Sequence, residues 1–293
     1  MDLIDLHTHS NASDGSLSPA ELVELAKAEG LLALAITDHD TVDGVDQALA
    51  AGERLGVKVI PGVELSVAGG PRGSMHVVGL FLDHRHPELA LGLARVKKAR
   101  AERNPKMAAL LNDLGIDLTM EEVAAHSGGG QVGRPHFAQA LVQRGVVKNP
   151  QEAFVRFLGA GKPAYVPKEK LASAEGIELI NRAGGLAILA HPGLLKLGIN
   201  QMEALLKELA GQGLAGLEAW YSEHDPVLAK RLAALAARLG LAVSGGTDFH
   251  GAGKPAIRLG VGRGALRVGE EVLTELQRRL RAARARAGGA NGE

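Results

Sequence analysis

Short apolar segments alternate along the chain with longer segments whose apolar residues recur at helical spacing. The short segments predict seven β-strands, at Asp2–Leu6, Leu31–Ile36, Val57–Ile60, Met75–Leu80, Leu186–Leu189, Ala215–Ala219 and Leu241–Ser244. Helix starts are marked by the capping box Ser18-Pro19-Ala20-Glu21, by Asn200 with Glu203, and by Asp225 before Pro226. This alternation is typical of an α/β protein built on a parallel sheet.

The alternation stops between about residues 87 and 167. Helical patterns cover Arg95–Leu114, Thr119–His126, Arg134–Gly145 and Pro150–Leu158, and we predict no strand among them. We therefore expect a helical insertion, residues 87–167, in a discontinuous barrel-like domain made of residues 1–86 and 168–281. The Ala-, Gly- and Arg-rich tail, residues 282–293, is expected to fray.

Composition narrows the classes of function. Among the 293 residues, Lys and Arg total 33 and Asp and Glu total 33, so no general attraction to a DNA duplex or an anionic membrane is expected. The absence of cysteine excludes disulfides, cysteine-ligated zinc and thiol catalysis. The N-terminal sequence lacks a signal-peptide pattern, and no apolar run approaches the roughly 20 residues of a membrane span. We expect a cytoplasmic protein. The sequence does not indicate its oligomeric state.

Histidines and carboxylates fall beside the predicted strands. The positions are His7, His9, Asp14, His39, Glu64, His76, His191, Asp248 and His250. In a parallel barrel the strand C-termini open onto one face, so residues distant in sequence would converge there. A single histidine at a strand end is commonly structural, and we assign no ligand role to His84, His86 or His126, while His224 is left undecided. Several such residues at successive strand ends favour a metal site.

The residue types limit which ions could bind. Imidazole and carboxylate without thiolate suit Zn²⁺, Mn²⁺ or Fe²⁺. The set is too large for one ion, because a catalytic ion usually keeps about three protein ligands. It suffices for two or three ions, and closely spaced ions in phosphatases and nucleases clamp a hydroxide and the phosphoryl oxygens together.

A series of motifs resembles the PHP (polymerase and histidinol phosphatase) superfamily of metal-dependent phosphoesterases. The matching segments are Asp5-Leu-His-Thr-His-Ser10, Ser13-Asp-Gly15, Thr37-Asp-His-Asp40, Gly62-Val-Glu-Leu-Ser66, Met75-His76, Ala190-His-Pro192 and Gly246-Thr-Asp-Phe-His250. They run in family order along nearly the whole chain. The resemblance implies a distorted (β/α)₇ barrel with a trinuclear metal centre.

The resemblance also implies ligand roles. One metal would be held by His7, His9, Glu64 and Asp248; a second by Glu64, His76 and His191; and a third by Asp14, His39 and His250. Glu64, His191 and Asp248 would be the catalytic residues, with a hydroxide bridging two metals as the nucleophile. Many family members carry His where Asp14 stands, which would weaken the third site or favour the harder Mn²⁺ or Mg²⁺. We expect two or three divalent ions, with Mn²⁺ favoured over Zn²⁺, Fe²⁺ or Mg²⁺. Asp38 and Asp40 would either orient His39 or cap the following helix.

The insertion bears on the substrate. Its segments Gly133–Ala138 and Gly161–Val166 resemble a stand-alone branch that includes 3′,5′-nucleoside bisphosphate phosphatases and 5′→3′ exoribonucleases of short RNA. Arg134, His136 and Lys162 are then candidates for gripping a second phosphate, the alternative being a solvated surface.

An aromatic content of 3% disfavours a long single-strand groove, since such grooves use stacking platforms. The expected function is hydrolysis of a phosphate monoester of a nucleotide. The alternatives are exonucleolytic cleavage of short 5′-phosphorylated RNA and a histidinol-phosphatase-like activity. A non-enzymatic metal- or nucleotide-binding regulator is the rival from another class.

Overall fold

One mixed sheet organises the protein. The computed structural model describes residues 3–71 and 73–289. The strands are β1 (Ile4–Asp5), β2 (Ala33–Ile36), β3 (Lys58–Ala68), β4 (Met75–Leu80), β5 (Leu171–Ala172), β6 (Leu186–Leu189), β7 (Gly216–Tyr221) and β8 (Ala242–Gly246). Their order is β1-β2-β3-β4-β6-β7-β8, with the short β5 pairing β3. The expected barrel-like α/β fold is confirmed, and all seven predicted strands are present. Six lie within two residues of their predicted bounds, but β3 extends to Ala68 rather than ending at Ile60, so Glu64 lies inside this strand and not after it. The two-residue β5 was not predicted.

The fourth strand departs from the expected parallel arrangement, because β4 is antiparallel to both β3 and β6. The cause is the short connection, residues 69–74, since a parallel crossover needs roughly a dozen residues or more. Gly69, Gly70 and Gly73 adopt the positive φ angles that tight turns require. As a consequence, the start of β4, which carries His76, lies at the rim where the neighbouring parallel strands end.

The two ends of the sheet meet and nearly close the barrel. Leu6 N donates to Gly245 O at 3.3 Å, and Asp248 N donates to His7 O at 2.8 Å. A Cβ atom at Gly246 would lie 2.4 Å from the His7 nitrogen, so this contact requires glycine. The closure places the loops that follow β1 and β8 side by side.

Helices cover the outside of the barrel. They are α1 (Pro19–Ala28), α2 (Val45–Leu55), α7 (Ser173–Arg182), α8 (Ile199–Gly211), α9 (Pro226–Arg238) and α10 (Glu270–Gly289), with 3₁₀ turns η2 (Pro192–Leu195) and η3 (Gly251–Gly253). The predicted caps of α1 and α9 at Ser18 and Asp225 are confirmed. The start predicted at Asn200 is wrong: α8 begins at Ile199 after Gly198, whose N–H donates to the Gln201 side chain. None of the described helices is long and apolar enough to cross a membrane.

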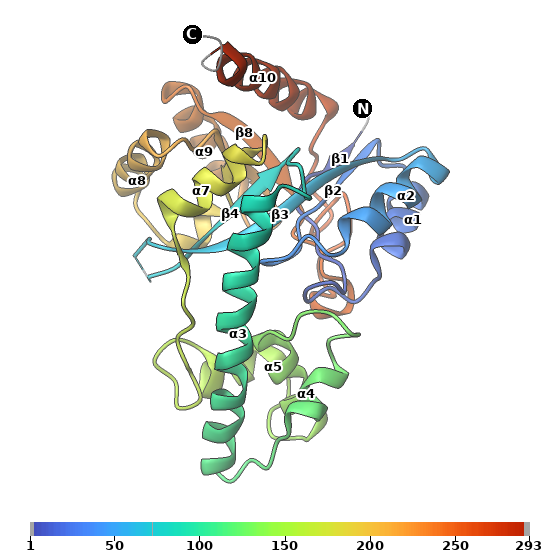
Figure 1. Cartoon of the computed structure of the whole chain (residues 1–293), viewed down its shortest axis with the longest axis vertical. Coiled ribbons are helices and arrows are strands. Elements are labelled where there is room, and N and C mark those ends of the chain that lie inside the picture. Colours follow the sequence, from blue (N-terminus) through green and yellow to red (C-terminus); the bar gives the residue numbers. More distant parts are fainter. Residues whose placement is uncertain (1–2, 72, 290–293) are drawn as a thin grey trace.

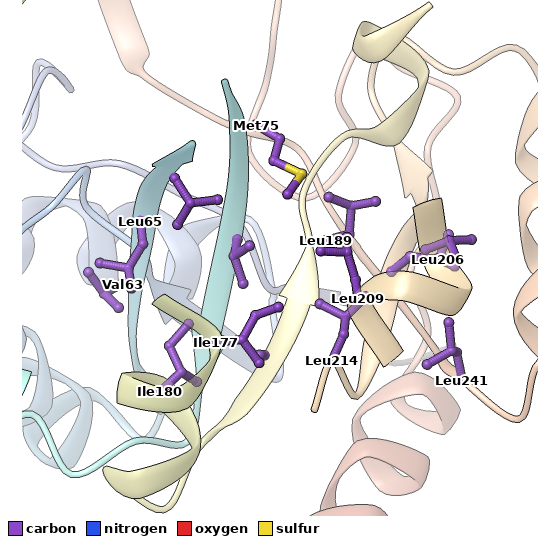
Figure 2. Close-up of a cluster of buried hydrophobic side chains, with 14 of the residues drawn as sticks. Val63, Leu65, Met75, Ile177, Ile180, Leu189, Leu206, Leu209, Leu214 and Leu241 are labelled. Carbon is purple, nitrogen blue, oxygen red and sulfur yellow. The ribbon is translucent and has the colours of Figure 1, made fainter. Parts of the chain in front are cut away.

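The main apolar core lies between the sheet and these helices. Figure 2 shows part of it, where Ile177 and Ile180 of α7 lie over β3 and β4 and Leu206 of α8 lies beside Leu189 of β6. All four of these side chains are fully buried. This packing fixes the strands whose ends carry the polar residues described below.

The segment between β4 and β5 is helical. It contains α3 (Pro87–Asp113), α4 (Met120–Ala125), α5 (Arg134–Gln143), α6 (Pro150–Ala153) and a π-helical turn η1 (Phe154–Leu158). The long α3 starts at the barrel and extends away from it, and α4 and α5 lie beside its far half (Figure 1). This far half has its own apolar core, which runs from Met107 to Ala164. Because α3 is continuous across both parts, it fixes the helical segment relative to the strand ends.

The C-terminal segment is more ordered than expected. Residues 282–289, predicted to fray, continue α10, while residues 290–293 lie outside the described part of the chain. Alanine and arginine favour helix, and two arginines dock it on the barrel. Arg279 donates to Gly240 O at 2.6 Å, and Arg284 donates to Gly184 O at 3.0 Å. In Figure 1, α10 lies at the opposite end of the molecule from α4 and α5.

Candidate metal centre and active site

The strand ends bring the predicted ligands together at one rim of the barrel. His7 and His9 follow β1, His39 follows β2, His191 follows β6, and Asp248 and His250 follow β8, while Glu64 and His76 lie in β3 and β4. Asp14 comes from the loop before α1. Their donor atoms form four overlapping groups within 4.8 Å: His9, Asp14, His39 and His250; His7, His9 and Asp248; His7, Glu64 and His191; and His39, Glu64 and His76. The sequence therefore predicted the convergence of these side chains.

Glu64 lies at the centre of the cluster. Its Oε2 is 2.7 Å from His39 Nδ1 and 3.4 Å from His9 Nε2. Its Oε1 is 2.8 Å from His76 Nδ1 and 2.9 Å from His191 Nε2. One carboxylate thus faces imidazoles from three different strand ends and from β4, which is the geometry of a bridging ligand.

Asp248 presents its two oxygens to different surroundings. Its Oδ1 lies 3.2 Å from His9 Nε2 and 3.4 Å from His250 Nδ1. Its Oδ2 accepts hydrogen bonds from Tyr221 Oη at 2.8 Å and from Lys254 Nζ at 2.6 Å. The second pair of contacts turns Oδ1 toward the imidazoles.

Backbone strain concentrates at this rim. Asp40, His191 and Asp248 have φ angles of 56°, 30° and 57°, in the left-handed region that non-glycine residues seldom adopt. Such conformations cost of order 1–3 kcal/mol each and persist where the surrounding structure enforces them. At His191 and Asp248 this conformation directs the side chain into the site, and Asp40 is the neighbour of His39.

Glu218 is a site residue that the sequence analysis did not identify. It lies in β7 and is buried, and its Oε1 is 2.8 Å from His7 Nδ1. Its Oε2 accepts from the His191 backbone N–H at 2.7 Å. A carboxylate on the far nitrogen of a histidine fixes the ring and raises its basicity as a ligand. The sequence feature that could have identified Glu218 is a single carboxylate inside an otherwise apolar strand.

The donor atoms at this site fit divalent cations. Eleven buried side-chain polar atoms of the described chain have no partner in hydrogen-bonding geometry. Five of them lie here, although some are close to one another: His7 Nε2, His9 Nδ1, His9 Nε2, His39 Nδ1 and Glu64 Oε2. Buried polar atoms in proteins are almost always hydrogen-bonded. Five unpaired atoms in one place therefore indicate that their lone pairs bind a cation. Imidazole and carboxylate together suit divalent transition metals.

The imidazoles and carboxylates of the cluster shift one another's pKa values strongly. Burial would raise the pKa of Glu64, but the imidazoles of His39, His76 and His7 outweigh it and hold that pKa well below its usual range. Burial together with His250 and His39 lowers the pKa of His9 well below its usual value. Burial would lower the pKa of His7, but Glu218, Glu64 and Asp248 outweigh it and raise that pKa well above its usual value, so binding of a cation at His7 would release a proton.

A cavity of about 300 Å³ opens beside the cluster, between the rim and the helical segment. His76 and His191 line one side of it. The side formed by the helical segment and the residues that lead from it to β5 carries four cationic residues: Arg103, Arg134, Lys168 and Lys170. In the described structure none of Arg103, Arg134 and Lys170 forms an ion pair with a carboxylate. This side of the cavity therefore presents an excess of positive charge.

The three residues predicted to grip a second phosphate are placed differently. Arg134 lines the cavity, and its guanidinium lies 5.6 Å from the centre of the Tyr165 ring. His136 is buried, and its Nδ1 accepts from Gly133 N–H at the start of α5, which is a capping role. Lys162 is exposed and is not part of the cavity lining. The structure thus brings only Arg134 of the three to this cavity and adds Arg103, Lys168 and Lys170, which lack a motif in sequence.

The two aspartates beside His39 adopt neither of the roles considered for them. Asp38 accepts from Ser10 N at 2.8 Å and Ser13 Oγ at 2.6 Å, and so holds the loop that carries Asp14. Asp40 pairs with Lys168 and Arg100. Burial would raise the pKa of Asp40, but these two cations hold it well below its usual range.

A barrel whose strand ends carry a histidine–carboxylate cluster, with cations facing it, defines a metal-dependent phosphoesterase. The PHP domain family model matches residues 5–149. The chain is 37% identical over 252 residues to a 3′,5′-nucleoside bisphosphate phosphatase of Chromobacterium violaceum, covering 86% of this chain and 88% of the relative. It is 39% identical over 246 residues to a 5′-3′ exoribonuclease of Haemophilus influenzae, covering 84% and 89%.

Two solved structures are also similar to this chain over most of its length. An amidohydrolase structure from Chromobacterium violaceum with bound sulfate and no metal superposes with a TM-score of 0.82 at 36% identity, covering 88% of this chain and 89% of that one. A protein of Bifidobacterium adolescentis assigned to the metal-dependent phosphoesterases gives a TM-score of 0.83 at 32% identity, covering 95% and 96%. This chain belongs to the PHP family. The prediction of an enzyme that hydrolyses phosphate esters is confirmed, and the regulator hypothesis is set aside.

Proposed function

We propose that the protein is a phosphatase that removes one phosphate from a 3′,5′-nucleoside bisphosphate. The observation that carries this proposal is the cavity between the histidine–carboxylate cluster and Arg103, Arg134, Lys168 and Lys170. A substrate with two phosphates would place one at the cluster and the other against these cations. Charge-assisted hydrogen bonds to phosphate contribute about 1.5–3 kcal/mol each, enough to discriminate against a substrate with one phosphate.

Two or three divalent ions would be held by the clustered side chains. Glu64 would bridge two of them, with His7, His9 and Asp248 on one side and His76 and His191 on the other. Asp14, His39 and His250 would hold a third, and His9 lies within reach of that group as well. We favour Mn²⁺, because the carboxylates are hard donors beside many imidazoles. When bound, such ions supply Lewis-acid activation of water and neutralise charge on a phosphoryl group.

The chain's own residues orient both reacting partners. Glu218 and Asp248 fix the directions of the imidazole and carboxylate donors through the contacts described above. Arg134 keeps its charge throughout the accessible pH range and would grip the remote phosphate, and its stacking near Tyr165 fixes the plane of the guanidinium. Binding energy from this remote phosphate would hold the scissile phosphate at the cluster.

Exonucleolytic cleavage of short 5′-phosphorylated RNA is the second candidate. The names of the relatives from Haemophilus influenzae and Escherichia coli favour it, at 39% and 35% identity. The same cations would then bind the 5′-phosphate, while the first internucleotide linkage would lie at the cluster. The two candidates therefore share a binding mode and differ in the bond that is cleaved.

A substrate panel with elemental analysis tests the proposal. The purified protein is analysed for Mn, Zn, Fe and Mg and then assayed with adenosine 3′,5′-bisphosphate, AMP, histidinol phosphate and a 5′-phosphorylated trinucleotide. We expect the highest kcat/KM on the bisphosphate and loss of turnover after chelation. Highest kcat/KM on the trinucleotide would replace the proposal with the second candidate. Highest kcat/KM on histidinol phosphate would overturn both.

A further inference from the structure

Asp40 connects the metal-ligand rim to both ends of the helical segment. It directly follows His39, is buried, and has the left-handed φ of 56°. Its Oδ1 accepts from Ser66 N–H at 2.8 Å, two residues beyond Glu64 on β3. Its Oδ2 is 2.5 Å from Lys168 Nζ and also pairs with Arg100. The residue thus links β2 and β3 to two cations that are distant in sequence.

The two cations that pair with Asp40 lie toward opposite ends of the helical segment along the chain. Arg100 lies in α3, by which the chain leaves the barrel, and Lys168 lies just before β5, where the chain returns. Their side chains are only 12% and 8% exposed. A buried cation without a carboxylate costs several kcal/mol, so Asp40 holds both in place.

Lys168 also lines the cavity that faces His76 and His191. The nearby Arg100 and Arg103 repel it, and Asp40 is the only carboxylate with which it pairs among the described residues. Removing Asp40 would therefore release Lys168 and Arg100 from their present positions, because neither cation pairs with any other carboxylate of the described structure.

We propose that Asp40 is a positioning residue that holds Lys168 on the cation side of the cavity, ready for the substrate's second phosphate; Arg100, which pairs with the same carboxylate, is not part of the cavity lining. The inference rests on the proposed function for the identity of the substrate. It adds that specificity for the second phosphate is set by a carboxylate that touches neither that phosphate nor the ions.

The test uses Asp40→Asn, because asparagine keeps the side-chain shape and tolerates the left-handed conformation. Asp38→Asn is the matched control, since Asp38 is equally buried on the other side of His39 but bonds only serines of the Asp14 loop. kcat and KM are measured for adenosine 3′,5′-bisphosphate and p-nitrophenyl phosphate, together with bound metal and the melting temperature.

For D40N we expect KM for the bisphosphate to rise at least about tenfold, corresponding to one lost charge-assisted contact. kcat/KM for the aryl phosphate should change less than about threefold, and the metal content should stay constant. D38N should lower kcat/KM for both substrates by the same factor. An equal loss on both substrates in D40N, a loss of metal in D40N, or no change on the bisphosphate would overturn the inference.

Two further measurements separate this inference from the proposed function and from misfolding. If the wild-type protein shows no preference for the bisphosphate, the proposed function fails. The crystal structure of D40N then decides the inference, because unmoved Lys168 and Arg100 side chains would overturn it. If D40N is less stable than the wild type, D40N, K168M and D40N/K168M are compared at a temperature at which the melting curves show all three variants folded. Asp40 acting through Lys168 predicts that the effects on KM do not add, whereas additive effects would contradict it.

Discussion

Glu218 Oε1 lies 2.8 Å from His7 Nδ1, and this contact leaves Nε2 of the same ring facing Glu64 and Asp248. The glutamate thereby selects which nitrogen of His7 is free to bind a cation. Its other oxygen accepts from the His191 backbone N–H, so one side chain orients ligands from β1 and β6.

Glu218→Gln is therefore expected to weaken metal binding by about 10- to 100-fold while the fold is retained. The amide keeps the size of the side chain but removes the charge that orients His7. The measurement is a Mn²⁺ titration of chelator-treated protein by calorimetry. Glu223→Gln is the control, because Glu223 pairs with Arg263 on the surface. Equal affinities of E218Q and wild type would show that Glu218 only fills space.

Glu64→Gln is expected to reduce kcat at least about 100-fold and to lower the number of bound ions, with little change in the circular dichroism spectrum. Both oxygens of Glu64 face imidazoles, and an amide would offer one acceptor and one donor in their place. Turnover assays and elemental analysis of the variant check this. Wild-type turnover would exclude a bridging role.

The convergence of the candidate ligands could be predicted from sequence because most of them follow an apolar strand. What the sequence could not show was the direction of β4, although the short connection of residues 69–74 was a usable signal. His76 starts its strand where the other ligands end theirs, and it reaches the rim only because β4 is antiparallel.

The cation side of the cavity was harder to predict, since it depends on tertiary packing. Arg103 and Lys168 are separated by most of the helical segment and carry no motif, and the fold alone brings them to one cavity. His136 and Lys162 belong to motif-like segments, yet one caps α5 and the other is exposed. Residue type identifies phosphate-binding chemistry, but burial and orientation decide which cations can use it.

Arg134→Ala is expected to lower kcat/KM for adenosine 3′,5′-bisphosphate about tenfold or more and to leave p-nitrophenyl phosphate within about threefold. Only the bisphosphate can use the guanidinium at the far side of the cavity. Arg156→Ala is the matched control, because Arg156 belongs to the same helical segment but pairs with Glu152 on the surface. A fall by the same factor for both substrates in R134A would make Arg134 a structural residue.

The last prediction concerns pH. Burial, together with the nearby Arg100, lowers the pKa of Lys168 from 10.5 to about 8, although Asp40 acts in the opposite direction. Lys168 is therefore charged below about pH 8 and loses its charge as the pH rises through that value. Phosphate monoesters have a second pKa near 6, so the substrate's charge does not change over the same interval.

The preference for the bisphosphate should consequently fall as the pH rises. We expect the ratio of kcat/KM for adenosine 3′,5′-bisphosphate to that for p-nitrophenyl phosphate to drop several-fold to about tenfold between pH 7 and pH 9.5. Taking the ratio cancels effects of pH on the ions, which act on both substrates. Lys168→Arg provides the control, because a guanidinium stays charged throughout and should keep the ratio constant. A constant ratio in the wild type, or the same decline in K168R, would show that Lys168 does not bind the second phosphate.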